Sequence, residues 1–565
     1  MCSEKAYFIG VDVGTQSVRA GLVTCHGEVV EVSSLPIRTS NPFSNMYEQS
    51  SDEIWALCIQ VIKTVTKNVD NSLIKGIGFD ATCSLVALDR DFQSLSVSKT
   101  GDTKQNIMLW MDHRATEEAS FINSKKNKVL KYVGNIISPE MEPPKLVWLK
   151  KNLPNQWAKA GHFFDLPDYL TWKATGSLQR SLCSLGCKWT YVPGSECGGW
   201  QDDFWTEIGL GDLVEEKYVK IGTDVLLPGE ACGNGLSIEA ANELGLIPGI
   251  PVSASIIDAH SGGLGVLACT ASEEKVQTLD DRMALISGTS TCHMKISKNP
   301  IFTPGVWGPY YSAMVPNYWC SEAGQSAAGS LLDHVINTHS ASIALKEEML
   351  ANKDSRHITD VLNEYAEELK KSRDLPSVSL LVSDYHVYPD YHGNRSPVAN
   401  PDMKGMICGL SLSSDREDLV KVYISTVQAL AYSTKHIINA LEEKGHVIKT
   451  LLFCGGLSKN YLYVQLHADI IGLQVIIPET KEPVLVGSAI LAASAAKYYH
   501  SVEEAMSFMC GKGKLIESCT HDKIFHEKKY KVFLTLLKCQ EEVRKIMEKQ
   551  YNSQDISSQK ESFTA

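Results

Sequence analysis

A short turn near the start of the chain carries the first group of residues that could do chemistry. The turn GTQS (14–17) separates two apolar segments, 7–13 and 18–23, and this pattern predicts a β-hairpin. The polar side chains in and beside the turn are Asp12, Thr15, Ser17 and Arg19. Turn N–H groups, hydroxyls and a guanidinium all favour a bound phosphate, and a carboxylate suits the Mg²⁺ that accompanies a nucleoside triphosphate. An ordinary surface hairpin is the alternative.

A second turn of the same kind lies in the other half of the chain. GTST (288–291) again separates two strand-like segments, 283–286 and 292–296. Two such hairpins would clamp one triphosphate from both sides, with Gly288 and Thr289 among the groups that contact it. The P-loop pattern G-x-x-x-x-G-K-[ST] occurs nowhere in the sequence, so a different phosphate site is expected.

Asp258 is the residue that we expect to act as a general base. It follows an apolar, strand-like segment, 252–257, and it precedes a predicted turn with Gly262 and Gly263. A carboxylate at a strand end is well placed to take a proton from a bound substrate. The glycines also fit a loose dinucleotide-binding fingerprint, but no acidic residue ends a following strand where it could bind a ribose.

Three further sites place polar or flexible groups near expected strand ends. Asp80 ends the apolar segment 73–79, where it would form a pocket wall or cap a turn. Lys188 could reach a substrate hydroxyl or be an ordinary solvated lysine. Gly455 and Gly456 join a strand to a helix, so the backbone there could lie against a planar ring such as adenine or form a plain tight turn.

Composition limits the classes of protein that this chain can be. Its 565 residues exceed one ordinary core, so at least two domains are expected. The formal net charge of -12 argues against a nucleic-acid partner. We expect neither a membrane span nor a signal peptide, because no apolar segment is long enough and a strand begins close to the N-terminus. The 16 cysteines are scattered without a C-x-x-C pair, which favours free thiols and a cytoplasmic protein.

The elements expected around these residues alternate between strands and helices, as in an α/β protein. Small apolar residues at 483–499 predict a buried helix, and the polar helical segment 334–372 is expected to be an addition to the second half. Asp112 and Arg114 begin a further helix, where they would bind a polar substrate or pair with each other. Residues 551–565, rich in Ser and Gln, are predicted to be disordered.

These motifs, in their order along the chain, resemble those of the FGGY family of carbohydrate kinases, within the actin-like ATPase and sugar kinase superfamily. The segments that carry the resemblance are DVGTQSVR (12–19), WMDHR (110–114), DAH (258–260), SGTST (287–291) and GGLSKN (455–460). Within the family the chain is most similar to D-ribulokinases, on GFDATCS (78–84), CKW (187–189), PGVWGPY (304–310) and HGNRSP (392–397). The Met-His pair typical of xylulokinases is missing. The two signature regions of the family, at 143–152 and 409–426, follow the usual consensus only loosely.

The resemblance implies two ribonuclease-H-like lobes around a cleft. The sugar would bind mainly to an N-terminal lobe, 1–270, and ATP mainly to a C-terminal lobe, 271–550. The implied reaction uses ATP and Mg²⁺ to phosphorylate the primary hydroxyl of a ketopentose, with D-ribulose converted to D-ribulose 5-phosphate. Because phosphoryl transfer demands little basicity, the pKa of the base need not differ much from the usual value of about 3.9 for Asp.

The resemblance also implies roles for the residues named above. Asp258 would be the base, and Asp12 would hold Mg²⁺. The phosphate contacts would come from Thr15, Ser17, Arg19, Gly288 and Thr289. The adenosine contacts would come from Gly455, Gly456 and Asn460. The sugar contacts would come from Asp80, Lys188 and Glu322.

Two alternatives stay open at this stage. The chain could phosphorylate another polyol or ketose, such as xylulose or glycerol. It could also be a non-catalytic nucleotide-binding module on the same scaffold, which would keep the phosphate clamp and lose the base. The oligomeric state is open as well, and a homodimer is one option.

Overall fold

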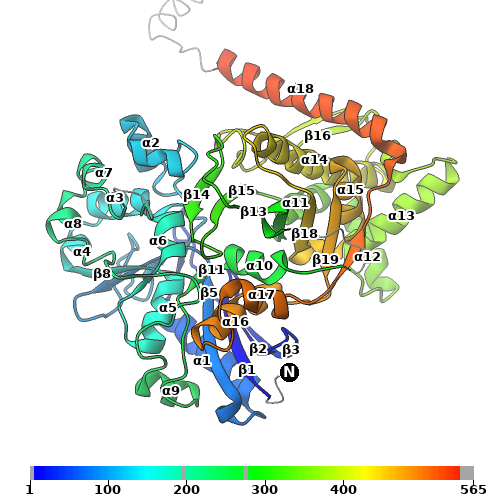
Figure 1. Cartoon of the computed structure of the whole chain (residues 1–565). Helices are drawn as coiled ribbons and strands as arrows, with labels where there is room; N and C mark the ends of the chain where they lie inside the picture. The colour runs from blue at the N-terminus through cyan, green and yellow to red at the C-terminus, as the bar shows by residue number, and fades with distance from the viewer. Residues whose placement is uncertain (1–4, 194–197, 272–277, 548–565) are drawn as a thin grey trace, which may run out of the picture.

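Two mixed β-sheets form the centres of two lobes, and each is built around one of the expected hairpins (Figure 1). The computed structural model describes residues 5–193, 198–271 and 278–547, so the tail 551–565 lies outside the described residues. The N-terminal sheet has the order β11-β5-β1-β2-β3. Its strands are β1 (Tyr7–Val13), β2 (Ser17–Thr24), β3 (Val29–Pro36), β5 (Ile74–Ala81) and β11 (Ile256–Ile257).

The C-terminal sheet has the order β14-β15-β13-β12-β18-β19-β20. Its strands are β12 (Arg282–Ser287), β13 (Thr291–Ser297), β14 (Trp307–Tyr311), β15 (Trp319–Gln325), β18 (Thr450–Cys454), β19 (Gln474–Pro478) and β20 (Gly513–Ile516). The prediction that GTQS and GTST each join two antiparallel strands is confirmed, because β1 pairs with β2 and β12 pairs with β13.

Both sheets share one pattern of connections. In the N-terminal sheet three antiparallel strands, β1, β2 and β3, are followed by β5 and β11, which run parallel to β1. In the C-terminal sheet β12, β13 and β15 are antiparallel, and β18 and β19 run parallel to β12. The repeated pattern confirms the expected α/β class with two ribonuclease-H-like lobes.

Two helices are exchanged between the lobes and lie side by side at the centre of the molecule (Figure 1). Helix α16 (Pro483–Ala495) follows β19 of the C-terminal sheet but packs on β1 and β5. Helix α10 (Asp258–Leu267) follows β11 of the N-terminal sheet but packs on β12 and β18. The buried helix expected at 483–499 is therefore confirmed as far as Ala495.

Glycines make these close contacts sterically feasible. A Cβ atom on Gly10 would lie 2.1 Å from the carbonyl oxygen of Leu485. Between the two helices, a Cβ on Gly265 would lie 1.9 Å from the carbonyl oxygen of Pro483. The prediction of a flexible turn around Gly262 and Gly263 is wrong: both are inside α10, where small residues allow close helix packing.

The remaining elements cover the outer faces and frame the cleft. Helices α1 (Ser51–Thr66), α5 (Leu166–Thr175) and α9 (Ile238–Leu244) pack in the N-terminal lobe, and α14 (Arg416–Glu442) and α15 (Tyr461–Ile471) in the C-terminal lobe. The segment expected as one helical addition forms parts of three helices, α11 (Gly329–Thr338), α12 (Ala341–Ala351) and α13 (Ile358–Ser372). None of the helices in the described part of the chain has the length and apolarity needed to cross a bilayer.

In a small second sheet of the N-terminal lobe, the inner strand β7 (Ile107–Met108) leads into the WMDHR segment. The order of this sheet is β4-β7-β6-β8, with β4 (Glu48–Gln49), β6 (Leu85–Asp89) and β8 (Ala160–Asp165). Helices α2 (Thr116–Lys125), α3 (Glu142–Asn152) and α6 (Leu182–Lys188) continue this lobe toward the cleft. This sheet and these helices position the side chains described next.

Candidate active site

A cavity of about 340 Å³ lies in the cleft between the lobes, and it is lined by most of the residues singled out in the sequence. The predicted residues that line it are Asp12, Thr15, Arg19, Lys188, Asp258, Gly288, Thr289, Glu322, Gly455 and Gly456. Residues far apart in the chain therefore meet at one place, as two facing hairpins require. Among the other residues that line the cavity are Cys83, Trp110, Glu140, Cys292, Trp307 and Arg395.

Two carboxylates form the centre of this cavity. Asp12 is near the end of β1 and Asp258 follows β11, and the parallel strand β5 lies between them. The Asp258 side chain accepts a hydrogen bond from the backbone N–H of Ala259 at 2.7 Å, at the first turn of α10. Burial, together with the nearby charge of Asp12, raises the pKa of Asp258 to about 7. The pKa of Asp258 is thus higher than the role of base requires, because burial and a neighbouring carboxylate both disfavour its ionised form.

Arg19 neutralises part of this negative charge. Its guanidinium pairs with Asp12, with Nε at 2.9 Å from the carboxylate, and with Glu482 at 2.7 Å. Asp12 and Arg19 are direct partners in the β1–β2 register, which explains why they meet. The predicted phosphate contact of Arg19 stays a prediction, since both carboxylates already occupy its donors. Glu482, which precedes α16, had no role in the sequence analysis.

The glycines of the two turns leave room for a ligand. The N–H of Gly288 donates to the carbonyl oxygen of Ser290 at 2.8 Å, and a Cβ on Gly288 would meet no atom nearer than 4.0 Å. A Cβ on Gly456 would also meet nothing within 4 Å. Gly455 differs, because its φ is +88° and a Cβ there would lie 2.5 Å from the carbonyl oxygen of Ser287. A side chain at Gly288 or Gly456 would therefore project into free space beside the cleft.

Lys188 and Glu322 form a buried ion pair across the cleft. Lys188 ends α6 of the N-terminal lobe and Glu322 lies on β15 of the C-terminal lobe. Their charged atoms are 3.2 Å apart, and only 4% of each side chain is exposed. Burial alone would lower the pKa of Lys188, but Glu322 raises it above its usual value, so the lysine stays charged. The alternative of a solvated lysine is wrong.

Three predicted site residues do not line the cavity. Asp80 is fully buried beside Asp12 and accepts a hydrogen bond from the Ser488 hydroxyl. Burial and the charge of Asp12 raise the pKa of Asp80 well above its usual value, and Asp80 is not among the residues that line the cavity. Ser17 begins β2, and its carbonyl oxygen accepts from the N–H of Gly14 at 3.0 Å.

Asn460, the third of these residues, caps a helix. Its side chain accepts from the N–H of Tyr463 at the start of α15, at 3.2 Å, and donates to the Tyr423 hydroxyl at 2.7 Å. It also accepts from the side chain of Asn363 at 3.0 Å. These bonds give Asn460 a structural role as a helix cap, and its adenosine contact stays a prediction.

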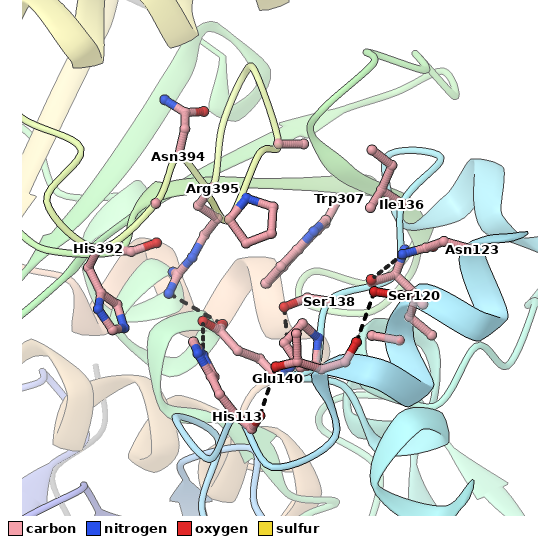
Figure 2. Close-up of a pocket in the computed structure, with 18 of the residues that line it drawn as sticks. His113, Ser120, Asn123, Ile136, Ser138, Glu140, Trp307, His392, Asn394 and Arg395 are labelled. Carbon is pink, nitrogen blue, oxygen red and sulfur yellow. Dashed lines mark hydrogen bonds and ion pairs between the residues drawn. The ribbon is translucent and has the colours of Figure 1, made fainter. Parts of the chain in front are cut away.

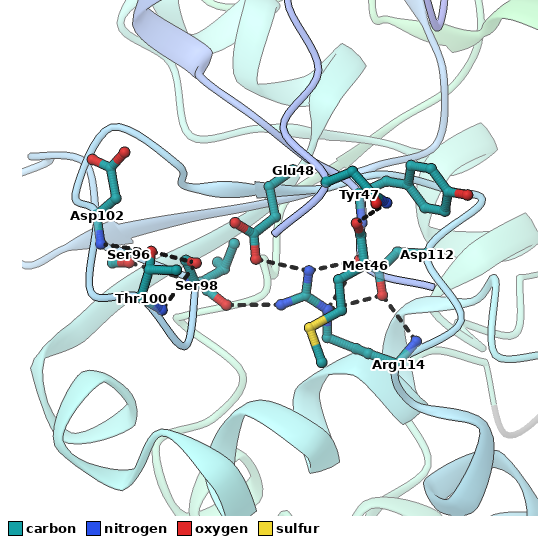
Figure 3. Close-up of polar contacts among 11 residues, drawn as sticks. Met46, Tyr47, Glu48, Ser96, Ser98, Thr100, Asp102, Asp112 and Arg114 are labelled. Carbon is teal, nitrogen blue, oxygen red and sulfur yellow. Dashed lines mark hydrogen bonds and ion pairs between the residues drawn. The ribbon is translucent and has the colours of Figure 1, made fainter. Parts of the chain in front are cut away.

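The Asp112–Arg114 pair of the WMDHR segment is structural rather than a ligand site (Figure 3). The side chain of Arg114 is fully buried and forms a bidentate ion pair with Asp112. It also donates a hydrogen bond to the Glu48 carboxylate at 2.9 Å. A further bond at 2.9 Å reaches the carbonyl oxygen of Val97. Of the two alternatives for Asp112 and Arg114, pairing with each other is correct. The pair fixes the loop that presents Trp110 to the cleft, where the indole N–H donates to Thr15 at 3.0 Å.

Several solved structures are similar to this chain in fold. A xylulose kinase from Rhodospirillum rubrum has a TM-score of 0.73 at 19% identity, with 94% of this chain and 98% of that chain covered. A Plasmodium falciparum glycerol kinase solved with ADP has a TM-score of 0.72 at 16% identity, with 94% and 98% covered. At this identity the likeness shows the fold alone, and it agrees with the two-lobed architecture described above.

The family follows from the sequence profiles. The profile "FGGY family of carbohydrate kinases, N-terminal domain" matches residues 7–265, and the corresponding C-terminal domain profile matches residues 283–496. The chain belongs to the FGGY family of carbohydrate kinases, and it is an enzyme that transfers a phosphoryl group to an alcohol. Sugar kinases of this family use ATP.

Relatives with curated names agree with this assignment. A protein named FGGY carbohydrate kinase domain-containing protein from Xenopus laevis is 51% identical over 96% of this chain and 98% of its own length. The human protein of the same name is 51% identical over the same shares of the two chains. A protein named D-ribulokinase from Saccharomyces cerevisiae is 40% identical over 89% of this chain and 73% of its own length.

Proposed function

We propose that this kinase transfers the γ-phosphoryl group of ATP to the primary hydroxyl of a ketopentose, and that D-ribulose is its preferred substrate. The observation that carries the proposal is the arrangement of Asp258 and the Lys188–Glu322 pair on one cavity between the lobes. The Asp258 carboxylate can accept a proton there, and the buried Lys188 and Glu322 can form hydrogen bonds with the hydroxyl groups of a sugar. The 40% identity with the yeast protein named D-ribulokinase supports the choice of sugar.

Asp258 acts in this proposal as the general base. It orients the primary hydroxyl of the sugar and accepts its proton as the oxygen attacks the γ-phosphorus atom. One O–P bond forms, the bond from the γ-phosphorus to the bridging oxygen breaks, and ADP leaves. Because the transition state is loose, the protein contributes mainly by aligning the two substrates and stabilising charge.

The residues near Asp12 fit a hard divalent cation. Asp12 and Asp258 offer carboxylate oxygens close enough for one to raise the pKa of the other, and Arg19 is the cation that now balances Asp12. Oxygen donors of this kind suit Mg²⁺, which would neutralise phosphate charge when bound with ATP. We assign Asp12 to hold it, directly or through water. The open space beside Gly288 and Gly456 fits a nucleotide whose phosphates approach the turns closely.

The Lys188–Glu322 pair would select among sugars through its hydrogen-bonding groups. Lys188 is a donor and Glu322 an acceptor, so a hydroxyl of the wrong epimer would leave one of them unpaired.

Every cysteine in the described ranges carries a free thiol, which is consistent with a proposed place in the cytoplasm.

A substrate panel tests the proposal directly. Wild-type enzyme is assayed for ADP release with D-ribulose, D-xylulose, L-ribulose, ribitol and glycerol, each with ATP and Mg²⁺. We expect the highest kcat/KM with D-ribulose. A higher kcat/KM with D-xylulose or glycerol would overturn the choice of sugar and leave the kinase assignment intact, whereas the absence of phosphorylation across the panel would favour a nucleotide-binding module.

A further inference from the structure

A second cavity, whose lining Figure 2 shows, adjoins the cleft cavity, and one arginine lines both of them. The second cavity has a volume of about 230 Å³. It shares three residues with the cleft cavity: Glu140, Trp307 and Arg395. Sequence reasoning gave none of these three a role. Arg395 and Trp307 belong to the segments HGNRSP and PGVWGPY, which contributed only to the family resemblance. Nothing in the spacing of these segments links them to the other motifs.

Arg395 is a buried cation with donors to spare. Only 6% of its side chain is exposed, yet its contacts are long: 3.4 Å to Glu140 and 3.6 Å to the sulfur of Cys292. Its Nε atom is buried and has no hydrogen-bond partner. A guanidinium has five N–H donors, and leaving buried donors unpaired costs free energy. This arrangement is typical of a group whose proper partner is a ligand.

The protein holds Arg395 in place through its loop. The side chain of Asn394 accepts from the N–H of Val398 at 2.9 Å and donates to Asp390 at 2.7 Å. Gly324 leaves room for the guanidinium, because a Cβ there would lie 3.1 Å from both Cδ and one terminal nitrogen of Arg395. The side chain therefore projects from the C-terminal lobe in a fixed direction.

Aromatic rings and an acid of the other lobe surround the guanidinium. It lies 5.5 Å from the ring of Trp307 and 5.9 Å from that of Trp110. Glu140 comes from the N-terminal lobe, and His113 approaches the same carboxylate at 3.6 Å (Figure 2). Although burial opposes it, Arg395 and His113 lower the pKa of Glu140 to about 2, so the acid is ionised and anchors the arginine across the cleft.

The Trp307 ring links Arg395 to the Lys188–Glu322 pair. Its centre lies 4.3 Å from the Lys188 ammonium and 5.5 Å from the Arg395 guanidinium. Asp258, the ion pair and Arg395 all line the cleft cavity. An acyclic sugar with its primary hydroxyl at Asp258 would therefore share this cavity with the ion pair and with Arg395.

We propose that Arg395 forms a separate sugar subsite, where its guanidinium donates hydrogen bonds to the carbonyl and hydroxyl oxygens at the end of the sugar remote from Asp258. Glu140 is a positioning residue that holds the guanidinium there. Because Arg395 comes from one lobe and Lys188 from the other, a sugar bound to both would also hold the cleft closed. The inference rests on the proposed kinase activity toward an acyclic sugar.

The test compares binding of the two substrates in Arg395 variants. Arg395→Met should raise both the KM and the calorimetric Kd for D-ribulose about tenfold or more, the effect of losing a charged hydrogen bond, while the Kd for ATP stays within about twofold. Arg395→Lys should lose part of the effect, since it keeps the charge without the planar fork. Glu140→Gln should raise the sugar KM less than Arg395→Met does and leave kcat nearly unchanged.

Lys404→Met is the matched control, because Lys404 is an exposed cation on the second cavity that does not line the cleft. We expect it to leave the sugar KM unchanged. Thermal melting of each variant shows that it is folded, and Arg395→Lys serves if Arg395→Met is not. An unchanged sugar KM in a folded Arg395 variant would overturn the proposal, as would a raised KM for ATP in place of the sugar. Should the wild type prefer another ketopentose, the choice of D-ribulose fails, and the same comparison with that sugar decides on Arg395.

Discussion

Lys188 and Glu322 belong to different lobes and meet as a buried ion pair with charged atoms 3.2 Å apart. The ammonium also lies 4.3 Å from the centre of the Trp307 ring, so an aromatic surface of the C-terminal lobe covers it. Removing one member of a buried ion pair is strongly unfavourable, because it leaves the other charge buried and uncompensated. The pair thus links the sugar cavity to the relative position of the lobes.

Removing one partner of this pair should affect both stability and selectivity. Lys188→Met leaves Glu322 as an uncompensated buried charge, and we expect a loss of roughly 3–5 kcal/mol in the free energy of unfolding. The double variant with Glu322→Gln should recover part of it. Urea unfolding of both single variants and the double variant gives the coupling energy of the pair.

The same variants test the role of the pair in choosing the sugar. Lys188→Met keeps most of the side-chain volume but removes three donors, so the preference for D-ribulose over D-xylulose should decrease. If the ratio of the two kcat/KM values is unchanged in the folded variant, the pair is structural only, and the choice of sugar must come from other residues.

Asp258→Asn should abolish most of the activity without unfolding the protein. The amide cannot accept the hydroxyl proton, and loss of a general base typically costs about two to four orders of magnitude in rate. Nucleotide binding measured by calorimetry should be nearly unchanged. Near-normal turnover in this variant would show that another group takes the proton.

The raised pKa of Asp258 predicts an acid limb in the rate. Burial and the charge of Asp12 raise this pKa to about 7, so the carboxylate becomes protonated as the pH falls through 7 and kcat should decrease. The free energy of unfolding should change in the opposite direction. Since the native pKa exceeds the unfolded value of about 3.9, the stabilising contribution of Asp258 is fully present below that value and is lost as the pH rises through about 7.

Asp258→Asn supplies the control for the unfolding measurement. The pH dependence of unfolding should be weaker in the variant, because its amide does not titrate. A wild-type kcat that stays constant well below pH 7 would mean that the base has an ordinary pKa in the complex with both substrates.

Gly288→Val should weaken ATP binding and leave sugar binding unchanged. The added side chain meets no protein atom within about 4 Å at its Cβ, so the fold should tolerate it, and it would occupy space at the GTST turn. Gly211→Val, at the start of α8 (Gly211–Glu215) and outside the cleft lining, is a control with similarly ordinary contacts. Calorimetry that finds unchanged ATP affinity in Gly288→Val would remove this turn from the nucleotide site.

Sequence reasoning succeeded where local pattern determines structure. The two hairpins could be predicted because a strand–turn–strand pattern is local. The order of the motifs along the chain then indicated the resemblance to the FGGY family. Asp80 could not be separated from Asp12 in this way. They are register partners on neighbouring parallel strands, and only the structure shows that Asp80 is fully buried, bonded to Ser488 of α16, and absent from the cavity lining. The place of Arg395 in the site could not be predicted for a related reason, since its partner Glu140 lies 255 positions away in the chain.

The exchange of α10 and α16 has a consequence for how the gene can be divided. Each sheet has one face covered by a helix that the other half of the chain encodes, with backbone contacts as close as those at Gly10 and Gly265 permit. A fragment ending near residue 270 would lack α16 and expose the apolar face of β1 and β5. We therefore expect neither half to be soluble when expressed alone, co-expression of the halves to restore activity, and the intact chain to melt in a single transition despite its two lobes.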